Sequence, residues 1–531
     1  MRRIRSAATA ATLGTAALLA GVLSGVAVEN PYVADVTVAQ PTAPDKGYFP
    51  SVVRTATGEL IAVYRQGNGH VDSSTSTTNA RIMLTRSTDD GQTWTTPIVA
   101  VDTPFDDRDP MITQVSSGDL LLNYFVADWW TDPALPSRQT YVVRSADDGA
   151  TWSAPVAVGG GFGDQAAPDS EGYRTGSNGT HGQIVELPDG DLLLPVYGSS
   201  PGHPRYSSGF VRSTDGGLTW ASTPTIAAQD PSVDFTEGQY VSLGTGEVAA
   251  LFRTNGTTAY LGRSGDGGAT WSSPVPLGLP AYSAHLLKIA AGSVLLTYGD
   301  ASGRFGPPRP TVARLIEDPG GDWNAYPDLL LYDAWLTADQ ANPSSVEIAP
   351  GEFLTLTYNT NTGAVVGKYS DTSDYANICT APCRRDDELD LAAMLGAGSV
   401  SIATDLTHTQ PGFGYHYAPQ RAIDGNDNYF ASATANRAAG APLQFTLTFD
   451  DPVTVDEIGL NLKPNYPESA TVQVSDDGVA WGAPVVSVTG AVTNSTVWHP
   501  LSSARTFRHV RVVITDSFGN WGQLTELRLA T

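Results

Sequence analysis

Short apolar runs separated by polar turns fill the first 375 residues, and helical periodicity is nearly absent there. Six times, a turn of the form Gly-(Glu/Asp/Ser) precedes an apolar strand that ends in an aromatic residue. These segments are residues 58–64, 118–124, 190–197, 246–252, 292–298 and 351–358. Each follows another short apolar strand, so the pattern is typical of β-hairpins. Six hairpins predict an all-β, six-bladed β-propeller over about residues 40–375.

A second repeat, Ser-x-Asp-x-Gly-x-Thr-Trp, occurs at residues 87–94, 145–152, 213–220 and 264–271. Its Ser and Asp side chains suit hydrogen bonding to local backbone, its Gly suits a positive φ, and its Trp suits packing beneath the turn. We expect these aspartate boxes on the outer hairpins of four blades.

Beyond residue 384 the pattern changes. Residues 399–531 alternate apolar strands with polar turns, which predicts an antiparallel β-sandwich. Residues 376–398 form the expected linker, and Cys379 and Cys383 within it favour a small disulfide-closed loop over a metal or redox site.

The N-terminus has the features of a secretory signal peptide. Arg2, Arg3 and Arg5 precede an uncharged run, which ends at a small-residue cleavage site near residues 25–28. No later stretch has the length and apolarity of a membrane span. The formal net charge of −25 argues against nucleic-acid binding. We therefore expect a secreted, extracellular, monomeric protein.

The repeat also indicates where function collects. The innermost strand of each blade starts at one end of the central channel, and binding sites of propellers gather there. Counting nine residues back from each repeat glycine gives Phe49, Asp109, His181, Glu237, Ser283 and Asn342. Two residues further on lie Ser51, Met111, Gln183, Gln239, His285 and Ser344. The first ring has Asp, His and Glu in three consecutive blades, a set that core packing would not select. Buried charges need partners. We therefore favour a polar ligand site over a structural ring of salt bridges.

In its hairpin repeat and its aspartate boxes, the chain resembles the sialidase superfamily over about residues 47–371. The six-bladed propellers of that family carry the same boxes. The resemblance implies that Arg253 and Arg309 match two arginines of a substrate-binding triad. It also implies that Glu237 matches the glutamate of the nucleophile pair and Asp72 the acid/base aspartate.

Two positions depart from that family pattern. Tyr48 stands where the first arginine is expected, which removes a bidentate grip on a carboxylate. Asn342 stands where the nucleophilic tyrosine is expected, which removes the covalent route.

The remaining groups suffice for a glycoside hydrolase that does not use a tyrosine nucleophile. Two carboxyl groups, one protonated and one ionised, can cleave a glycosidic bond. The candidates are Asp72, Asp109 and Glu237, with Asp72 as acid/base and either of the others as partner. Groups expected to contact the glycan are Arg65, Arg108, Arg253, Arg309, Tyr48, His70, His181, His285 and Asn342. No cofactor is expected for catalysis.

Three other functions stay open. A true exo-sialidase with an altered site is one. A propeller polysaccharide lyase acting at uronic acids is another, because His70, His181 and His285 fall near one end of the channel and histidine can serve as the base. A non-catalytic lectin is the third.

The C-terminal segment resembles discoidin-like (coagulation factor 5/8 type C) domains, which often bind carbohydrate. The resemblance implies a structural calcium near Asp424 and Glu526, whose hard oxygen ligands suit it. It also implies sugar-contacting aromatic residues on loops, of which the candidates are Tyr415, His416, Tyr417, Tyr429 and Trp521.

Overall fold

The computed structural model describes residues 34–70, 80–128, 137–158, 162, 178–199, 203, 205–256, 258–301, 309–332, 340–376, 385, 387–406, 419–423, 431–432, 441–462, 468–491, 496–517 and 523–531. The signal-peptide segment, Asp72, both cysteines, Asp424 and the five aromatic loop candidates lie outside these residues. In the part of the chain that is described, no helix is both long and apolar enough to cross a membrane.

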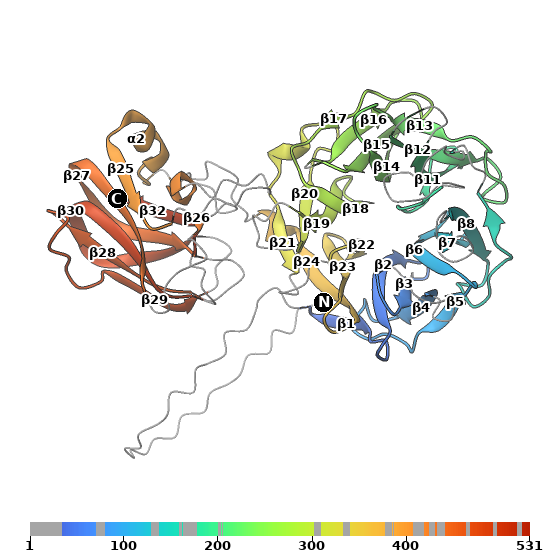
Figure 1. Cartoon of the computed structure of the whole chain (residues 1–531), viewed down its shortest axis with the longest axis horizontal. Coiled ribbons are helices and arrows are strands. Elements are labelled where there is room, and N and C mark those ends of the chain that lie inside the picture. The colour runs from blue at the N-terminus through green and yellow to red at the C-terminus, as the bar shows by residue number, and fades with distance from the viewer. Residues whose placement is uncertain are drawn as a thin grey trace, which may run out of the picture.

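Six antiparallel four-stranded sheets form the blades of a propeller, as the hairpin repeat predicts (Figure 1). Blades 1 and 2 are β2 (Lys46–Arg54), β3 (Leu60–Gly67), β4 (Arg81–Ser87), β5 (Ile98–Val101) and β6 (Asp106–Gln114), β7 (Leu120–Asp128), β8 (Ser137–Ser145), β9 (Val156–Ala157). Blades 3 and 4 are β10 (Val185–Glu186), β11 (Leu192–Ser199), β12 (Tyr206–Ser213), β13 (Thr225–Ala228) and β14 (Phe235–Gly244), β15 (Glu247–Thr254), β16 (Tyr260–Ser264), β17 (Val275–Pro276). Blade 5 is β18 (Ala281–Lys288), β19 (Val294–Asp300), β20 (Thr311–Ile316) and β21 (Leu329–Tyr332), with the short helix η1 (Trp323–Ala325) between the last two.

The sixth blade joins the two ends of the propeller. Its inner strands are β22 (Ser344–Ala349), β23 (Glu352–Asn359) and β24 (Ala364–Asp371), and α1 (Thr372–Ala376) follows them. Its outer strand is β1 (Val36–Ala39), which pairs antiparallel with β24 and places Val36 opposite Gly367. The N-terminal strand thus closes the ring, since its partners lie more than 300 residues further along the chain.

The four aspartate boxes lie between the third and fourth strands of blades 1 to 4 and repeat one set of hydrogen bonds. In the first box, Ser87 Oγ donates to Asp89 Oδ1 at 2.7 Å, and Asp89 accepts from the backbone and hydroxyl of Thr93 at 2.9 and 2.6 Å. The box glycines have φ of +80° to +87°, which favours glycine. The predicted turn chemistry is confirmed.

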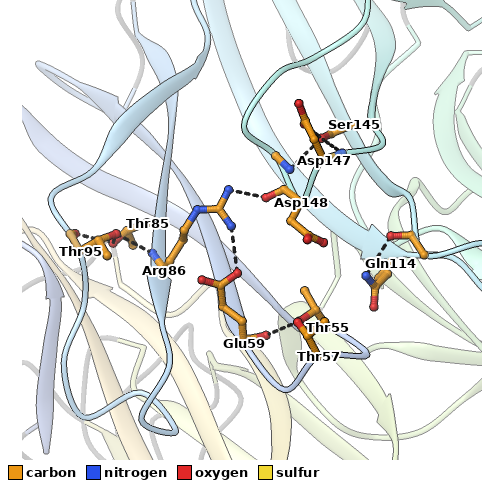
Figure 2. Close-up of polar contacts among 12 residues, drawn as sticks. Thr55, Thr57, Glu59, Thr85, Arg86, Thr95, Gln114, Ser145, Asp147 and Asp148 are labelled. Atoms are coloured by element: carbon orange, nitrogen blue, oxygen red, sulfur yellow. Dashed lines mark hydrogen bonds and ion pairs between the residues drawn. The ribbon is translucent and has the colours of Figure 1, made fainter.

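The boxes are also joints between blades. The residue before each box serine is an arginine that donates to a backbone carbonyl in the next blade. Figure 2 shows the first of these contacts, in which Arg86 reaches the carbonyl of Asp148 in the next box and the carboxylate of Glu59, 3.0 Å away, in its own blade. We call these four arginines, Arg86, Arg144, Arg212 and Arg263, the interblade arginines.

The C-terminal module contains a six-stranded antiparallel sheet and a separate two-stranded sheet. The large sheet contains β25 (Val400–Thr404), β27 (Leu443–Asn461), β28 (Glu468–Ser475), β29 (Val486–Ala491), β30 (Val497–Ser517) and β32 (Glu526–Ala530). The small sheet contains β26 (Ala431–Ser432) and β31 (Gln523–Leu524), and η2 is Pro419–Ile423. Alternate residues are buried over the first part of β27, residues 443–449, so the period-two pattern of the sequence is confirmed there as a one-sided strand.

Part of the predicted linker belongs to this module. Helix α2 (Leu391–Ala397) begins at Asp390, whose side chain accepts from the backbone N–H of Ala393, and ends at Gly398 with φ +77°. Leu391 lies in the hydrophobic core of the C-terminal module. The helix thus forms because it has both a capping residue and an apolar contact.

Candidate active site at the mouth of the propeller

The innermost strands share a backbone irregularity at the end where they begin, which we call the mouth. Phe49, Asp109, Glu237 and Ser283 all have φ between +47° and +51°, and the strand register slips at each of them. Four of the six counted ring positions therefore coincide with a β-bulge. Left-handed backbone at a non-glycine residue costs about 1–2 kcal/mol, and such strain collects at functional sites.

Glu237, on β14, is held as an anion. Its Oε1 lies 2.5 Å from Arg253 Nη1, and its Oε2 accepts a hydrogen bond from Ser283 Oγ at 3.0 Å. Burial alone would raise the pKa of Glu237, but Arg253, followed by His181, Ser283 and Arg309, lowers it to about 2. This carboxylate is therefore ionised at neutral pH.

Asp109, on β6, has the opposite environment. Burial raises the pKa of its carboxyl, and the negative charge of Glu237 adds to that shift, while Arg108, His181 and His70 oppose it. Its Oδ2 lies 3.9 Å from His181 Nδ1. Asp109 and Glu237 are thus electrostatically coupled carboxyl groups whose pKa values are displaced in opposite directions.

A second arginine–carboxylate cluster lies at blades 1 and 2 and is sealed from solvent. Arg65 Nη2 lies 2.8 Å from Asp106 Oδ1, and the side chains of both residues are 0% exposed. Arg108 Nη1 lies 3.2 Å from the other carboxylate oxygen of Asp106, and the Tyr48 ring covers Arg65 at 5.4 Å. By contrast, the side chains of Arg253 and Glu237 are 29% and 13% exposed.

This sealing corrects three of our expectations. We predicted Arg65, Arg108 and Tyr48 as substrate contacts, but Asp106 engages both guanidinium groups and the Tyr48 ring packs on Arg65. Arg65 also donates to the carbonyl of Gly69 at 2.7 Å, and Arg108 to that of His70 at 2.7 Å. Because the guanidinium groups hold protein oxygens away from solvent, these residues shape the mouth and do not line its open surface.

The three predicted histidines differ in environment. His285 Nε2 lies 3.1 Å from Gln183 Oε1, and its Nδ1 accepts from the backbone N–H of Ser345 at 3.2 Å. Burial, and next the charge of His181, lowers the pKa of His285 to about 3. With both nitrogens engaged, His285 is a structural group, so the set of bases for a lyase shrinks to His70 and His181.

Gln183 extends this structural layer across the axis of the propeller. Its Nε2 donates to the carbonyls of Val52 in blade 1 and Ile112 in blade 2, at 3.1 and 2.7 Å. Together with His285 this residue links blades 1, 2, 3 and 5. The second counted ring therefore includes a hydrogen-bonded layer beneath the mouth.

The remaining candidates also lie at the mouth. His70 is exposed and its ring contacts the edge of Phe49, with the ring centroids 5.1 Å apart. Arg309 is half-buried, donates from Nε to the carbonyl of Gln340 at 2.6 Å, and contributes to the pKa shift of Glu237. Asn342, in the place of the expected tyrosine, is 6% exposed.

The structure also adds residues that sequence reasoning missed. Tyr282 stacks on Arg253, with the guanidinium carbon 4.5 Å from the ring centroid. Asp106 is the acid that seals Arg65, although residues 105–110 already showed acids crowded around Arg108. The alternation along a strand gave no sign of which acid turns inward, because the bulge at Asp109 shifts the register.

The predicted calcium site is only partly within the described residues. Asp424 lies outside them, and Glu526 Oε1 is 3.9 Å from the guanidinium Nε of Arg528. Among the described residues, no group of three or more His, Cys, Asp or Glu side chains could hold a metal ion. A guanidinium beside the one described carboxylate does not suit a cation, so the calcium stays a prediction that rests on the resemblance alone.

The fold and the mouth define a six-bladed propeller with a polar site on its axis, followed by a β-sandwich module. Comparison with known families gives each part a class. The model of the BNR repeat-like domain matches residues 82–331, and that of the F5/8 type C domain matches residues 405–527. The chain thus combines a BNR repeat-like domain with a C-terminal F5/8 type C domain.

Individual relatives are distant. The chain is 26% identical over 208 residues to the xyloglucanase Xgh74A of Acetivibrio thermocellus, an alignment that covers 34% of this chain and 22% of that protein. It therefore spans about a fifth of the length of this curated relative. A protein of unknown function from Dyadobacter fermentans shares the fold at 24% identity, with a TM-score of 0.55 over 64% of this chain and 98% of that one. The Hadza microbial sialidase Hz136 is 21% identical, with a TM-score of 0.48 over 62% and 66% of the two chains.

Proposed function

We propose that this protein is a secreted glycoside hydrolase that cleaves terminal sugars from extracellular glycans with a pair of carboxyl groups. The observation that carries the proposal is a pair of carboxyl groups in opposite environments at one mouth, since Glu237 contacts Arg253 and Ser283 while Asp109 is 7% exposed and its Oδ1 has no hydrogen-bond partner among the described residues. Arg253 and Ser283 keep Glu237 ionised, while burial favours the protonated form of Asp109. Glycosidic cleavage needs one carboxyl group in each state.

In this proposal Glu237 acts as the base or nucleophile, and its partner donates the proton to the leaving oxygen. Asp109 is the partner among the described residues, and Asp72 is the partner that the family resemblance implies. The absence of a tyrosine at position 342 favours a route that differs from the tyrosine-nucleophile mechanism. The xyloglucanase and sialidase relatives support glycosidic cleavage as the general class of reaction.

The F5/8 type C domain fits the same proposal as a glycan-binding module that keeps the propeller near its substrate. Tethering raises the effective concentration of substrate around the mouth without any new contact in the active site. Deleting residues 399–531 is expected to weaken activity on polymeric glycans more than activity on short oligosaccharides. Equal loss on both substrates would contradict the tethering role.

The decisive experiment measures sugars released from a panel of sialylated, uronate-containing, pyranose and furanose glycans. Glu237→Gln is expected to lower kcat by about 100-fold or more, the usual scale for a positioned acid or base. Asp109→Asn and Asp72→Asn then separate the two candidate proton donors. Glu347→Gln is the matched control, because Glu347 accepts from the backbone N–H groups of Ala290 and Gly351, near the end of β22 that lies away from the mouth.

Three results would redirect the proposal. Full activity in Glu237→Gln would exclude Glu237 from the chemistry. Products that absorb in the near ultraviolet as unsaturated uronates would indicate a lyase. Binding of glycans without release of any sugar would indicate a lectin.

A further inference from the structure

Four polar atoms at or just beneath the mouth are buried without a hydrogen-bond partner among the described residues. They are Asp109 Oδ1, His181 Nδ1, Gln239 Nε2 and Asn342 Oδ1. The residues come from four different blades and are 7%, 1%, 3% and 6% exposed. We call this set the axial floor. Since buried polar groups in proteins are nearly always satisfied, such a set indicates a ligand or ordered water.

The local backbone shows that the floor is a built feature. Asp109 has a φ of +48°, and Gly182, next to His181, has a φ of +106°. A Cβ atom on Gly182 would lie 2.9 Å from the carbonyl oxygen of Gly238 and 3.1 Å from both amide atoms of Gln239. Glycine at this position leaves the room that the Gln239 amide occupies beside His181. The chain therefore keeps an unpaired amide at a place where its packing is tightly specified.

The chemistry of these atoms selects the kind of ligand. Asn342 Oδ1 is an acceptor and Gln239 Nε2 is a donor, whereas the Asp109 carboxyl and an imidazole nitrogen take either role according to where the proton lies. A hydroxyl group both donates and accepts, so it can satisfy every member of the set. A carboxylate only accepts, so it could not satisfy the Asn342 oxygen.

We propose that the axial floor binds the hydroxyl groups of an uncharged sugar ring, and that neutral glycans are therefore the substrate class of this propeller. The inference rests on the proposed function, since it assigns the sugar that the same mouth would cleave. Asn342 then has a positive role in recognition at the position where the family resemblance implies a nucleophile. Three of the four predicted arginines agree with this assignment, because Asp106 holds Arg65 and Arg108 while Glu237 holds Arg253. The fourth, Arg309, donates from Nε to the carbonyl of Gln340.

Free monosaccharides test the floor without any turnover. Ligand-observed NMR titration of the full chain would compare neutral sugars (arabinose, xylose, galactose, glucose) with acidic ones (N-acetylneuraminate, galacturonate). At least one neutral sugar is expected to bind at least tenfold more tightly than either acidic sugar. Asn342→Leu is expected to weaken that binding about fivefold, which corresponds to one hydrogen bond of about 1 kcal/mol. Asn342→Asp keeps an acceptor oxygen and serves as the conservative comparison.

Thermal unfolding of the sugar-free variants provides a readout that does not depend on binding. Replacing Asn342, whose buried Oδ1 has no partner among the described residues, by leucine is expected to leave the propeller as stable as the wild type or more stable. A purely structural asparagine would give a clear loss of stability with unchanged sugar binding, and that pair of results would overturn the proposal. Tighter binding of an acidic sugar would also overturn it.

The two proposals fail in different ways. If neutral sugars bind through Asn342 but no glycan is cleaved, the hydrolase assignment is wrong and the axial floor stands. If glycans are cleaved but sugar binding is insensitive to Asn342, the floor assignment is wrong and the hydrolase stands. Sugar bound by the C-terminal module does not interfere, because the test uses only the part of the binding signal that changes between the wild type and the Asn342 variants.

Discussion

Each box glycine packs against the preceding blade. The contribution of this contact to stability can be tested by replacing the glycine with alanine, which adds one methyl group. A Cβ atom on Gly268 would lie 2.8 Å from Phe210 Cζ in blade 3, closer than real Cβ contacts allow. Phe210 is fully buried and packs against the rings of Tyr240 and Trp271, so it has little room to move. We therefore predict that Gly268→Ala destabilises the joint between blades 3 and 4.

The expected loss has two parts. Gly268 has a φ of +86°, where alanine costs about 1–2 kcal/mol. Overpacking against Phe210 adds about 1–3 kcal/mol. Gly118 isolates the first part, because its φ is +92° and a Cβ there would meet nothing within 4 Å. Gly268→Ala should thus lower the free energy of unfolding by about 1–3 kcal/mol more than Gly118→Ala.

Urea unfolding followed by tryptophan fluorescence gives the comparison, provided that the m-values of the variants agree. Phe210→Leu in the Gly268→Ala background should recover part of the loss, because the shorter side chain opens space for the methyl group. Equal destabilisation by Gly268→Ala and Gly118→Ala would refute the packing role of the box. The turn would then act only within its own blade.

Three further predictions concern charge. Arg253→Met should raise the pKa of Glu237 and move the acidic limb of the pH profile of kcat/KM upward by about one to two units, because a protonated Glu237 is inactive in the proposed mechanism. The pKa of His285 is lower in the folded protein than its ordinary value of 6.5, so its contribution to stability is present above pH 6.5 and is lost as the pH falls toward 3. Between pH 7.5 and 4.5 this loss is about 2–3 kcal/mol, and His285→Gln should show a smaller change in urea unfolding between the two pH values. Arg144→Met should lower stability by about 1 kcal/mol by removing contacts to Asp119 and to the Gly216 carbonyl, and an unchanged urea midpoint would count against the interblade role.

Much of the propeller could be predicted because its signals are local. Hairpin turns and box turns are set by residues a few positions apart, and each repeats along the chain. The contacts between blades also have a pattern in the sequence, which our sequence analysis did not use. Blades 1 to 4 carry an acid after the hairpin glycine and an arginine before the box serine, whereas blade 5 has Ser293 and Leu315 at these positions. The two repeats pair with each other, since Arg86 contacts Glu59 and Arg212 contacts Asp191.

Other features had no local signal. The closing strand β1 is four residues long, and its partner lies at the other end of the propeller. Helix α2 did have signals in Asp390 and Gly398, but its length of seven residues hid it inside an apparent linker. The sealing of Arg65 depends on the rotation of Asp106 toward blade 1, which follows from tertiary packing and not from the pattern of either strand.

Four of the counted ring positions coincide with bulges, while the roles of these residues had no local signal. Alternation along a strand predicts which residues share a face only as far as the bulge, where the register shifts. It does not predict whether a charged residue on that face is open or covered. Arg65 and Arg253 both lie near the end of the second strand of their blades, β3 and β15, and both pair with a carboxylate. Yet one pair is fully buried and the other is partly exposed.

The two ends of each blade therefore carry different information. At the outer hairpins, box glycines and interblade arginines fix the spacing of the blades, and their repetition is what makes the fold recognisable. At the mouth, four of the six blades share a bulge, and the bulge residues Phe49, Asp109, Glu237 and Ser283 differ from blade to blade. Because the bulge fixes the backbone in blades as different as those of Phe49 and Glu237, a substitution at the mouth changes the chemistry while the propeller is retained. Tyr48 precedes the bulge residue Phe49, and Asn342 occupies the counted ring position of blade 6, so both departures from the family pattern lie away from the boxes that define the scaffold.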